Sequence, residues 1–184
     1  DINERISRIV VMGCGEPLDN YDNLVRFLAL ITNPDGYGLS RRNITVSTCG
    51  IVEGIRALAD LNPGVTLAIS LHAPTDELRR KIMPIANIYS IAEVIDASEY
   101  YFDQTGRRIT LEYALARDVN DSDECADKLA RIARRLCAHI NLIPVNPVTE
   151  RGYDPTSHAR VGAFKNKLEK NGINVTIRKE LGQD

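Results

Sequence analysis

The segment Gly13-Cys14-Gly15-Glu16-Pro17-Leu18-Asp19-Asn20 contains residue types that could bind a small charged molecule. It follows the apolar run Ile9 to Met12, and its two glycines allow the backbone to turn closely around a ligand. Glu16 places a carboxylate at the end of this predicted strand, where it could pair with an ammonium group. A tight turn between a strand and a helix uses the same residues, so this segment alone does not identify a site.

Four further segments place small, polar or proline residues at predicted strand ends. They are Ser47-Thr48-Cys49-Gly50, Ser70-Leu71-His72-Ala73-Pro74, Arg117-Asp118-Val119-Asn120-Asp121 and Asn146-Pro147-Val148. Their hydroxyl, imidazole and amide groups, together with the Glu16 carboxylate, suit a polar, zwitterionic or nucleoside-like ligand. Because connections in any soluble protein are polar, ordinary turns remain the alternative interpretation.

Short runs rich in β-branched residues alternate along the chain with stretches of helical periodicity. The predicted strands are Ser7 to Met12, Asn43 to Ser47, Val65 to Ser70, Arg108 to Leu115, His139 to Val145 and Asn174 to Arg178. The predicted helices are Tyr21 to Ile31, Val52 to Leu61, Ile91 to Phe102, Ser122 to Leu136 and Ser157 to Asn171, with a turn or short helix at Thr75 to Ile82.

This alternation predicts an α/β fold in which a mostly parallel sheet is joined by right-handed crossovers. About six strands are too few for a complete eight-unit barrel, so the sheet is either a partial barrel or open. In both arrangements ligands bind at the carboxyl ends of the strands. The five segments above are therefore expected to meet on one rim of the sheet.

The composition indicates one globular domain of 184 residues, 43% hydrophobic and 26% charged. The formal net charge of −2 gives no global electrostatic case for a nucleic-acid partner, although a local basic patch stays possible. No apolar stretch approaches the roughly 20 residues that cross a bilayer, so we expect no membrane contact. The chain opens without an initiator Met or a signal-like segment, and we expect it to be part of a longer protein.

Several chemistries are not supported by the motifs. The four cysteines are Cys14, Cys49, Cys125 and Cys137, and their spacing fits neither a disulfide framework nor a metal cluster. We therefore expect a cytoplasmic protein. His72, His139 and His158 show no zinc spacing, and no phosphate-binding loop of the Gly-x4-Gly-Lys-Ser/Thr type is present. A Ser-His-Asp triad cannot be assigned from residues on separate loops.

Five ordered motifs carry a resemblance to a known family. They are Met12 to Asn20, Ser47 to Gly50, Leu67 to Pro74, Val119 to Asp121 and Asn141 to Pro147. Together they resemble the radical S-adenosylmethionine (SAM) methyltransferases that methylate C2 of adenine in 23S ribosomal RNA and in transfer RNA. The resemblance runs through essentially the whole chain. It implies that residues 1–184 are a single fragment of a partial (β/α)6 radical SAM barrel.

The resemblance also implies a SAM site made by seven residues. Gly15 and Glu16 would hold the methionine part of SAM, and Ser47 would meet another polar group of the cofactor. The segment Ser70-Leu71-His72 would lie along the ribose, and Asn146 would complete the pocket. For Leu71 the alternative is core packing, with any contact to SAM made by its backbone.

A reduced [4Fe-4S] cluster and two catalytic cysteines belong to the chemistry that the resemblance implies. The cluster cleaves SAM to a 5′-deoxyadenosyl radical, and a methylated cysteine carries the methyl group to adenine. None of the four cysteines corresponds to a cluster ligand or a catalytic cysteine, so we expect these to lie outside the chain and the isolated chain to be inactive. Cys14 stands where the family loop has a methionine. Cys125 and Cys137 are expected to be small packing residues.

The RNA partners implied by the resemblance need phosphate-binding side chains, and basic residues that follow strand ends are the candidates. They are Arg79, Arg80, Lys81, Arg117, Arg151, Arg178 and Lys179. Arg41-Arg42 and Arg107-Arg108 precede strands and are expected on the opposite face. We also expect that an incomplete barrel would expose a sheet edge through which the chain could self-associate.

Two other function classes stay open from the residues alone. A non-radical barrel enzyme such as an aldolase-like lyase would need a lysine or metal ligands at the strand ends. None of the predicted strands contains a lysine. A catalytically silent SAM-, nucleoside- or RNA-binding module is the second alternative. The sequence does not distinguish ribosomal from transfer RNA, nor methylation at C2 from methylation at C8 of adenine.

Overall fold

The computed structural model describes residues 5–145 and 154–178, in which strands and helices alternate as predicted. The strands are β1 (Ile9–Val11), β2 (Ile44–Thr48), β3 (Thr66–Ser70), β4 (Ile109–Leu115), β5 (His139–Pro144) and β6 (Val175–Ile177). The α-helices are α1 (Tyr21–Thr32), α2 (Val52–Leu61), α3 (Asp76–Ile82), α4 (Ile91–Thr105), α5 (Asp123–Arg135) and α6 (His158–Lys170). Short 3-10 helices are η1 (Pro17–Asn20), η2 (Arg41–Asn43) and η3 (Pro84–Asn87).

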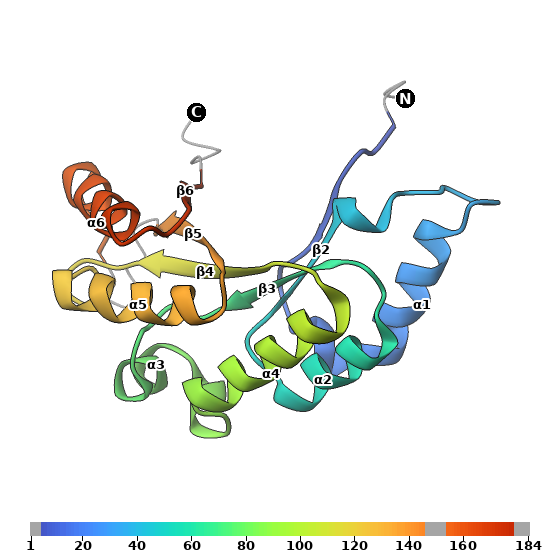
Figure 1. The fold of residues 1–184 in the computed structure, drawn as a ribbon, viewed down its shortest axis with the longest axis horizontal. Helices are drawn as coiled ribbons and strands as arrows, with labels where there is room; N and C mark the ends of the chain where they lie inside the picture. The colour runs from blue at the N-terminus through green and yellow to red at the C-terminus, as the bar shows by residue number, and fades with distance from the viewer. Residues whose placement is uncertain (1–4, 146–153, 179–184) are drawn as a thin grey trace.

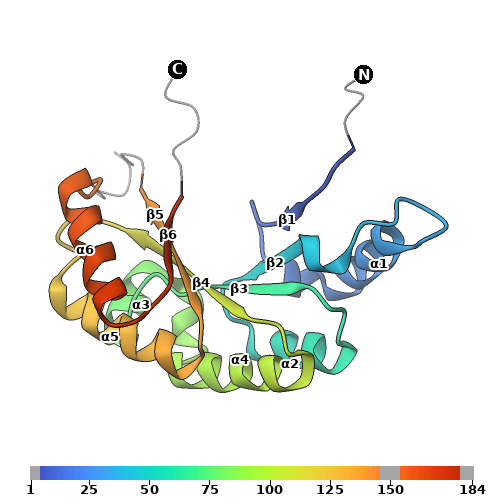
Figure 2. The ribbon, with the colours of Figure 1, turned by 45° about the horizontal axis from the view of Figure 1, so that its top comes forward.

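All six strands are parallel and form one sheet in the order β1-β2-β3-β4-β5-β6. Figures 1 and 2 show the sheet curving so that helices α2 to α5 cover its convex face while the concave face stays open. Because β1 and β6 are the two edges, the described strands form an open partial barrel. The predicted α/β fold with a partial (β/α)6 barrel is confirmed.

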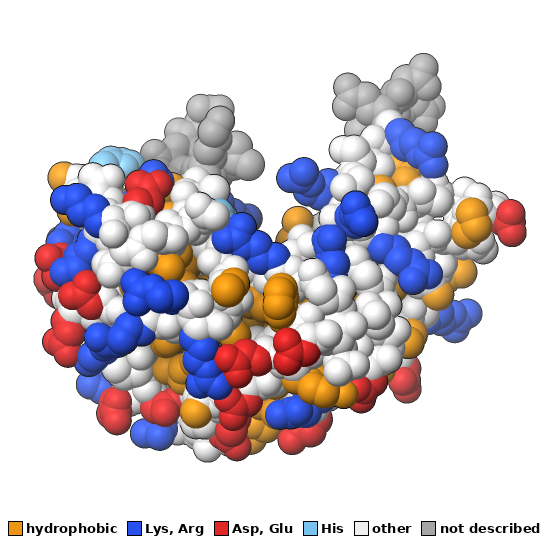
Figure 3. All heavy atoms as spheres, in the orientation of Figure 1, with side chains coloured by type: hydrophobic (Ala, Val, Ile, Leu, Met, Phe, Trp, Pro, Cys, Tyr) orange, Lys and Arg blue, Asp and Glu red, His pale blue; other side chains and the backbone are white. Residues whose placement is uncertain are grey.

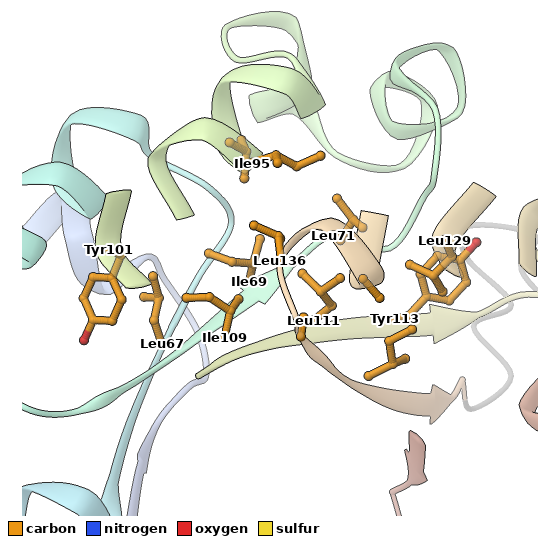
Figure 4. Close-up of a cluster of buried hydrophobic side chains, with 14 of the residues drawn as sticks. Leu67, Ile69, Leu71, Ile95, Tyr101, Ile109, Leu111, Tyr113, Leu129 and Leu136 are labelled. Atoms are coloured by element: carbon orange, nitrogen blue, oxygen red, sulfur yellow. The ribbon is translucent and has the colours of Figure 1, made fainter. Parts of the chain in front are cut away.

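The hydrophobic core lies between the sheet and the helices on its convex face. Leu67 and Ile69 of β3 and Ile109 and Leu111 of β4 are at most 1% exposed and point toward the helices in Figure 4. This follows from strand geometry, because alternate side chains of a strand share one face. The other residues of these strands are thereby left to the concave face.

The observed ends of the elements have local causes. Helix α4 runs three residues beyond the predicted Phe102 because Gly106 ends it, with φ +62° in the left-handed region that suits glycine. At its start, Ser90 and Glu93 form a capping box. Strand β1 is shorter than predicted and pairs only with β2 among the described strands.

No helix in the described part of the chain is long and apolar enough to cross a membrane.

Gly54 of α2 lets the loop that follows β1 lie against this helix. A Cβ atom at Gly54 would come within 2.8 Å of Cβ of Leu18, which is 5% exposed and belongs to η1. The Gly54→Ala variant is therefore expected to lower the free energy of unfolding by roughly 1–2 kcal/mol, although Ala is the better helix former. Urea denaturation measures this change.

Gly162 of α6 provides the matched control for Gly54. A Cβ atom there would have no atom within 4 Å among its described neighbours. The Gly162→Ala variant is expected to raise stability by up to about 1 kcal/mol, because Ala has the higher helix propensity. Equal effects of the two substitutions would contradict the close approach of η1 to α2.

Candidate functional site

The carboxyl ends of β1, β2 and β3 meet around one cavity of about 150 Å³. Its lining includes five of the predicted cofactor residues, namely Gly15, Glu16, Ser47, Ser70 and His72, together with Met12, Gly13, Pro17, Thr48, Cys49 and Met83. The concave side of the sheet is hollowed, as Figure 3 shows between the side that carries α1 and the side that carries α6. Basic side chains lie along the border of this hollow. Residues from three separate loops are thus brought together, as the strand-end argument predicted.

The Glu16 carboxylate ties two of these loops together. One oxygen accepts a hydrogen bond from the Leu18 N–H at 3.0 Å, which caps η1. The other accepts from the Cys49 N–H at 2.7 Å, across the ends of β1 and β2. Gly15, with φ +114°, provides the turn that aims Glu16 at both donors. Each oxygen keeps a further lone pair for a ligand, so this carboxylate is held in place while still able to accept a hydrogen bond.

The Cys49 thiol is not an activated nucleophile. Burial raises its pKa to about 12, with further contributions from a hydrogen bond to Glu16 and from the Glu16 charge, while the Arg79 charge acts in the opposite direction. The reactive form of cysteine is the thiolate, which a raised pKa disfavours at neutral pH. Cys49 therefore lines the cavity as a neutral, half-buried side chain.

His72 has a defined tautomer and an unusual backbone. Its φ of +56° lies in the left-handed region, and its Nδ1 accepts a hydrogen bond from the Ala114 N–H at 3.0 Å. Burial, with a smaller effect of the nearby Arg79 charge, lowers the pKa of His72 to about 4. The ring is therefore neutral near pH 7, with its proton on Nε2. His72 can offer that N–H to a ligand in the cavity.

Asn120 links the loop after β4 to His72 at the cavity. Its side chain is 1% exposed and donates to the carbonyls of His72 at 2.7 Å and Ala114 at 2.6 Å. Its Oδ1 accepts from the Ala116 N–H at 2.8 Å, and its own carbonyl accepts from the Tyr113 hydroxyl at 2.9 Å. Asn120 thus fixes the strained residue His72 against β4.

Leu71 does not line the cavity through its side chain. That side chain is 1% exposed and belongs to the hydrophobic core, which was the packing alternative. Its N–H donates to the Glu112 carbonyl at 3.1 Å, and its carbonyl accepts from Arg79 Nε at 3.3 Å. Any role of Leu71 toward a cofactor is thereby limited to its backbone.

Arg79 corrects the prediction of an exposed phosphate-binding residue. Its side chain is 0% exposed, and its Nη2 donates to the carbonyls of Cys49 at 2.6 Å and Ser70 at 3.5 Å. Gly50, with φ +101°, lets the backbone approach this guanidinium, because a Cβ atom at Gly50 would lie 3.2 Å from Nη2. Arg79 is used to join the ends of β2 and β3, so it is not available to RNA phosphates in this structure.

The other described basic candidates remain exposed. Arg80 and Lys81 lie on α3, and Arg178 follows β6 and contacts Met12, with 3.9 Å between Nη1 and Sδ. Arg117 is also exposed, but it contacts Asp154 at 3.7 Å and donates to the Pro155 carbonyl. The Asn146, Arg151 and Lys179 predictions lie outside the described residues.

The residues fit SAM better than they fit an iron-sulfur cluster. The cavity offers a carboxylate acceptor, the hydroxyls of two serines and one threonine, and an imidazole N–H, which suit the ammonium and ribose groups of SAM. In residues 5–145 and 154–178, no group of three or more His, Cys, Asp or Glu side chains could hold a metal ion. Cys14 and Cys137 are exposed, whereas Cys49 and Cys125 are partly buried. The cluster is therefore not assigned to these cysteines.

The fold and the cavity define a protein of the radical SAM class, and comparison with known families agrees. The family model described as "Radical SAM superfamily" matches residues 1–141. The chain therefore belongs to the radical SAM superfamily.

Individual relatives are more specific in their names. A protein of Lachnospira eligens named "Probable dual-specificity RNA methyltransferase RlmN" is 60% identical over 181 residues, which are 98% of this chain and 52% of that protein. A protein of the same name from Lachnoclostridium phytofermentans is 55% identical over 98% of this chain and 51% of its own length. The crystal structure of a radical SAM methyltransferase from Sphaerobacter thermophilus is 42% identical, with a TM-score of 0.92 over 96% of this chain and 52% of that one. The chain spans about half the length of these relatives.

Sequence reasoning missed two buried side chains beside the site. Arg79 was predicted to be exposed because it lies in a basic run with Arg80 and Lys81, from which the sequence does not separate it. Glu112 was not noticed, although a carboxylate inside the apolar run Ile109 to Leu115 is unusual for a strand. A search for charged residues inside predicted core elements would have found Glu112.

Proposed function

We propose that this chain forms the SAM-binding part of a radical SAM RNA methyltransferase that methylates C2 of adenine in 23S ribosomal RNA and transfer RNA. The observation that carries the proposal is the meeting of Gly15, Glu16, Ser47, Ser70 and His72 around one cavity at the strand ends. The names of the relatives support RNA methyl transfer as the reaction.

In this proposal the loop after β1 holds the methionine part of SAM. The Glu16 carboxylate accepts from the ammonium group, and Ser47 meets a second polar group. Ser70 and His72 lie along the ribose, where the Nε2–H of His72 donates to a hydroxyl, and Asn146 completes the pocket. When bound, SAM supplies the methyl group and, with a reduced [4Fe-4S] cluster, a carbon radical. This chain contributes the wall that orients SAM, as a single radical SAM core domain.

For RNA, the proposal uses the exposed residues Arg80, Lys81, Arg117 and Arg178, with Arg151 and Lys179 as further candidates. These residues would contact phosphates and position the RNA without reading its sequence.

The experiment uses a chimera in which this chain replaces the 181 matching residues of the Lachnospira eligens relative. With anaerobically reconstituted chimera, methyl-labelled SAM and 23S ribosomal RNA or transfer RNA, mass spectrometry is expected to find 2-methyladenosine in the digested RNA. The product 8-methyladenosine, or no labelled RNA while the intact relative methylates it, would contradict the proposal.

A substitution at Glu16 tests the proposed SAM contact directly. The Glu16→Gln variant is expected to bind SAM about ten-fold more weakly in calorimetry, because it loses the charge that faces the ammonium group. The exposed residue Asp19 of the same loop is the matched control, and Asp19→Asn is expected to bind SAM as the unaltered chimera does. Equal affinity of the two variants would remove Glu16 from the site.

A further inference from the structure

Glu112 is a buried carboxylate that makes none of the proposed SAM contacts. It lies in the middle of β4 and is 5% exposed, between the core residues Leu111 and Tyr113. Burial raises its pKa, while a hydrogen bond from Asn141 and the charge of Arg178 act in the opposite direction. A carboxylate held in such a place is unfavourable unless its oxygens have partners.

The position of Glu112 in the sheet shows which way it faces. Strand register places Ser70, Glu112, Asn141 and Thr176 side by side on β3, β4, β5 and β6. The adjacent residue Leu111 points toward the helices in Figure 4, and successive side chains of a strand point to opposite faces. The row of four polar residues therefore belongs to the concave face of the sheet.

The hydrogen bonds along this row have one direction. Thr176 Oγ1 donates to Asn141 Oδ1 at 3.0 Å, and Asn141 Nδ2 donates to Glu112 Oε2 at 2.8 Å. His139 Nε2 lies 2.9 Å from Thr176 Oγ1, whose single proton is already used, so His139 is the donor there. Every proton thus points toward Glu112, which is the final acceptor of the chain.

The second oxygen of Glu112 has no hydrogen-bond partner among the described residues. Among the described residues, only Oε2 accepts a hydrogen bond. Two buried side-chain atoms of the described part lack a partner, Arg79 Nη1 and Arg107 Nε, and Glu112 Oε1 is not one of them. The neighbouring residue Ser70 lines the candidate SAM cavity, and the Glu112 carbonyl accepts from the N–H groups of Leu71 at 3.1 Å and His72 at 3.3 Å. Glu112 therefore lies at the border between that cavity and the rest of the concave face.

We infer that Glu112 Oε1 accepts a hydrogen bond from an N–H or O–H group of a nucleoside bound on the concave face. The chain His139, Thr176 and Asn141 holds the carboxylate so that it presents an acceptor and not a donor. This inference rests on the proposed function, in which both SAM and the RNA substrate contain a nucleoside. The ligand chemistry is the same for both, and the experiment separates them.

The Glu112→Gln variant tests the inference with almost no change in shape. Asn141 still donates to position 112, so the glutamine must turn its carbonyl oxygen to Asn141 and its NH2 group to the hollow. The group offered to the ligand changes from acceptor to donor. In the chimera, we expect about ten-fold weaker SAM binding or an about ten-fold higher KM for RNA, with an unchanged melting temperature. The quantity that changes identifies which nucleoside Glu112 contacts.

The matched control is Glu53→Gln, the same substitution at an exposed carboxylate of α2, on the convex side of the sheet. It is expected to change either quantity less than about three-fold.

If the unaltered chimera neither binds SAM nor methylates RNA, the proposed function fails. If the unaltered chimera does both and Glu112→Gln matches it in SAM affinity and in KM for RNA, the present inference is overturned while the proposed function stands. Should Glu112→Gln not fold, Glu112→Asp decides, because retracting the carboxylate must weaken one of the two interactions.

Discussion

Replacing Arg79 with Met is expected to lower the free energy of unfolding by about 3 kcal/mol. It is also expected to weaken SAM binding, because the same side chain holds two of the loops that line the cavity. Urea denaturation measures the first effect, and calorimetric titration with SAM in the chimera measures the second. Both effects arise from a residue that offers no atom to the cavity surface.

The size of the effect follows from what Arg79 holds together. Its guanidinium donates to the carbonyls of Cys49, Ser70 and Leu71, which lie at the carboxyl ends of β2 and β3. Methionine fills similar space but donates no hydrogen bond, so the carbonyls of Cys49 and Ser70 lose this charged donor. The Leu71 carbonyl loses it too but keeps the Ala73 N–H at 2.8 Å. Each buried polar group left without a partner costs about 1 kcal/mol or more.

Two other variants separate this role from a general effect of charge. Arg80 is adjacent in the sequence and exposed, so Arg80→Met is expected to leave stability within about 0.5 kcal/mol of the unaltered chain. Arg79→Lys keeps the charge but cannot reach carbonyls of two loops with a planar fork, and should recover only part of the loss. If Arg79→Met and Arg80→Met were equally stable, the guanidinium would not be joining the strand ends.

The order of strands and helices could be predicted because hydrophobic periodicity reports directly on burial. Helix α2 was predicted at its observed bounds, Val52–Leu61, and the other α-helices deviate by at most three residues at either end. The three 3-10 helices were not predicted. Each has three or four residues, so none has a periodic pattern long enough to detect.

The gathering of the site residues could also be predicted, since parallel strands bring their carboxyl ends to one edge. What the sequence could not show is how those residues are held. Arg79, Arg80 and Lys81 look alike in the sequence, and α3 has only seven residues, so no helical face distinguishes the buried one. Likewise, Glu16 could be identified as an acceptor, but its hydrogen bond to the Cys49 N–H joins residues 33 positions apart and depends on the packing of two loops.

Acidification is expected to destabilise the protein through His72 by about 2 kcal/mol at pH 5 and about 3 kcal/mol at pH 4. The pKa of His72 in the folded protein is lowered to about 4 from its ordinary value of 6.5. Between these values the unfolded chain binds a proton that the folded chain excludes. The contribution of His72 to stability is therefore complete above pH 6.5 and is lost as the pH falls toward 4.

The reason for the exclusion lies in the contacts of the ring. A proton on Nδ1 would face the Ala114 N–H, which now donates to that nitrogen, so protonation breaks this hydrogen bond. The charged ring would also be buried near the Arg79 guanidinium. Both effects favour the neutral ring. Because the pKa of His72 in the folded protein is about 4, the proposed SAM contact is expected to persist until the pH approaches that value.

The His72→Asn variant isolates this contribution, because asparagine tolerates the left-handed backbone at position 72. Other groups also titrate on unfolding. The raised pKa of Glu112 opposes the effect, whereas the lowered pKa of the exposed residue Glu77 adds to it. The informative quantity is therefore the difference in unfolding free energy between the variant and the unaltered chain, measured by urea denaturation from pH 7 to pH 4.5. That difference should shrink as the pH falls below 6.5, and a difference independent of pH would show that His72 is protonated in the folded protein as readily as in the unfolded chain.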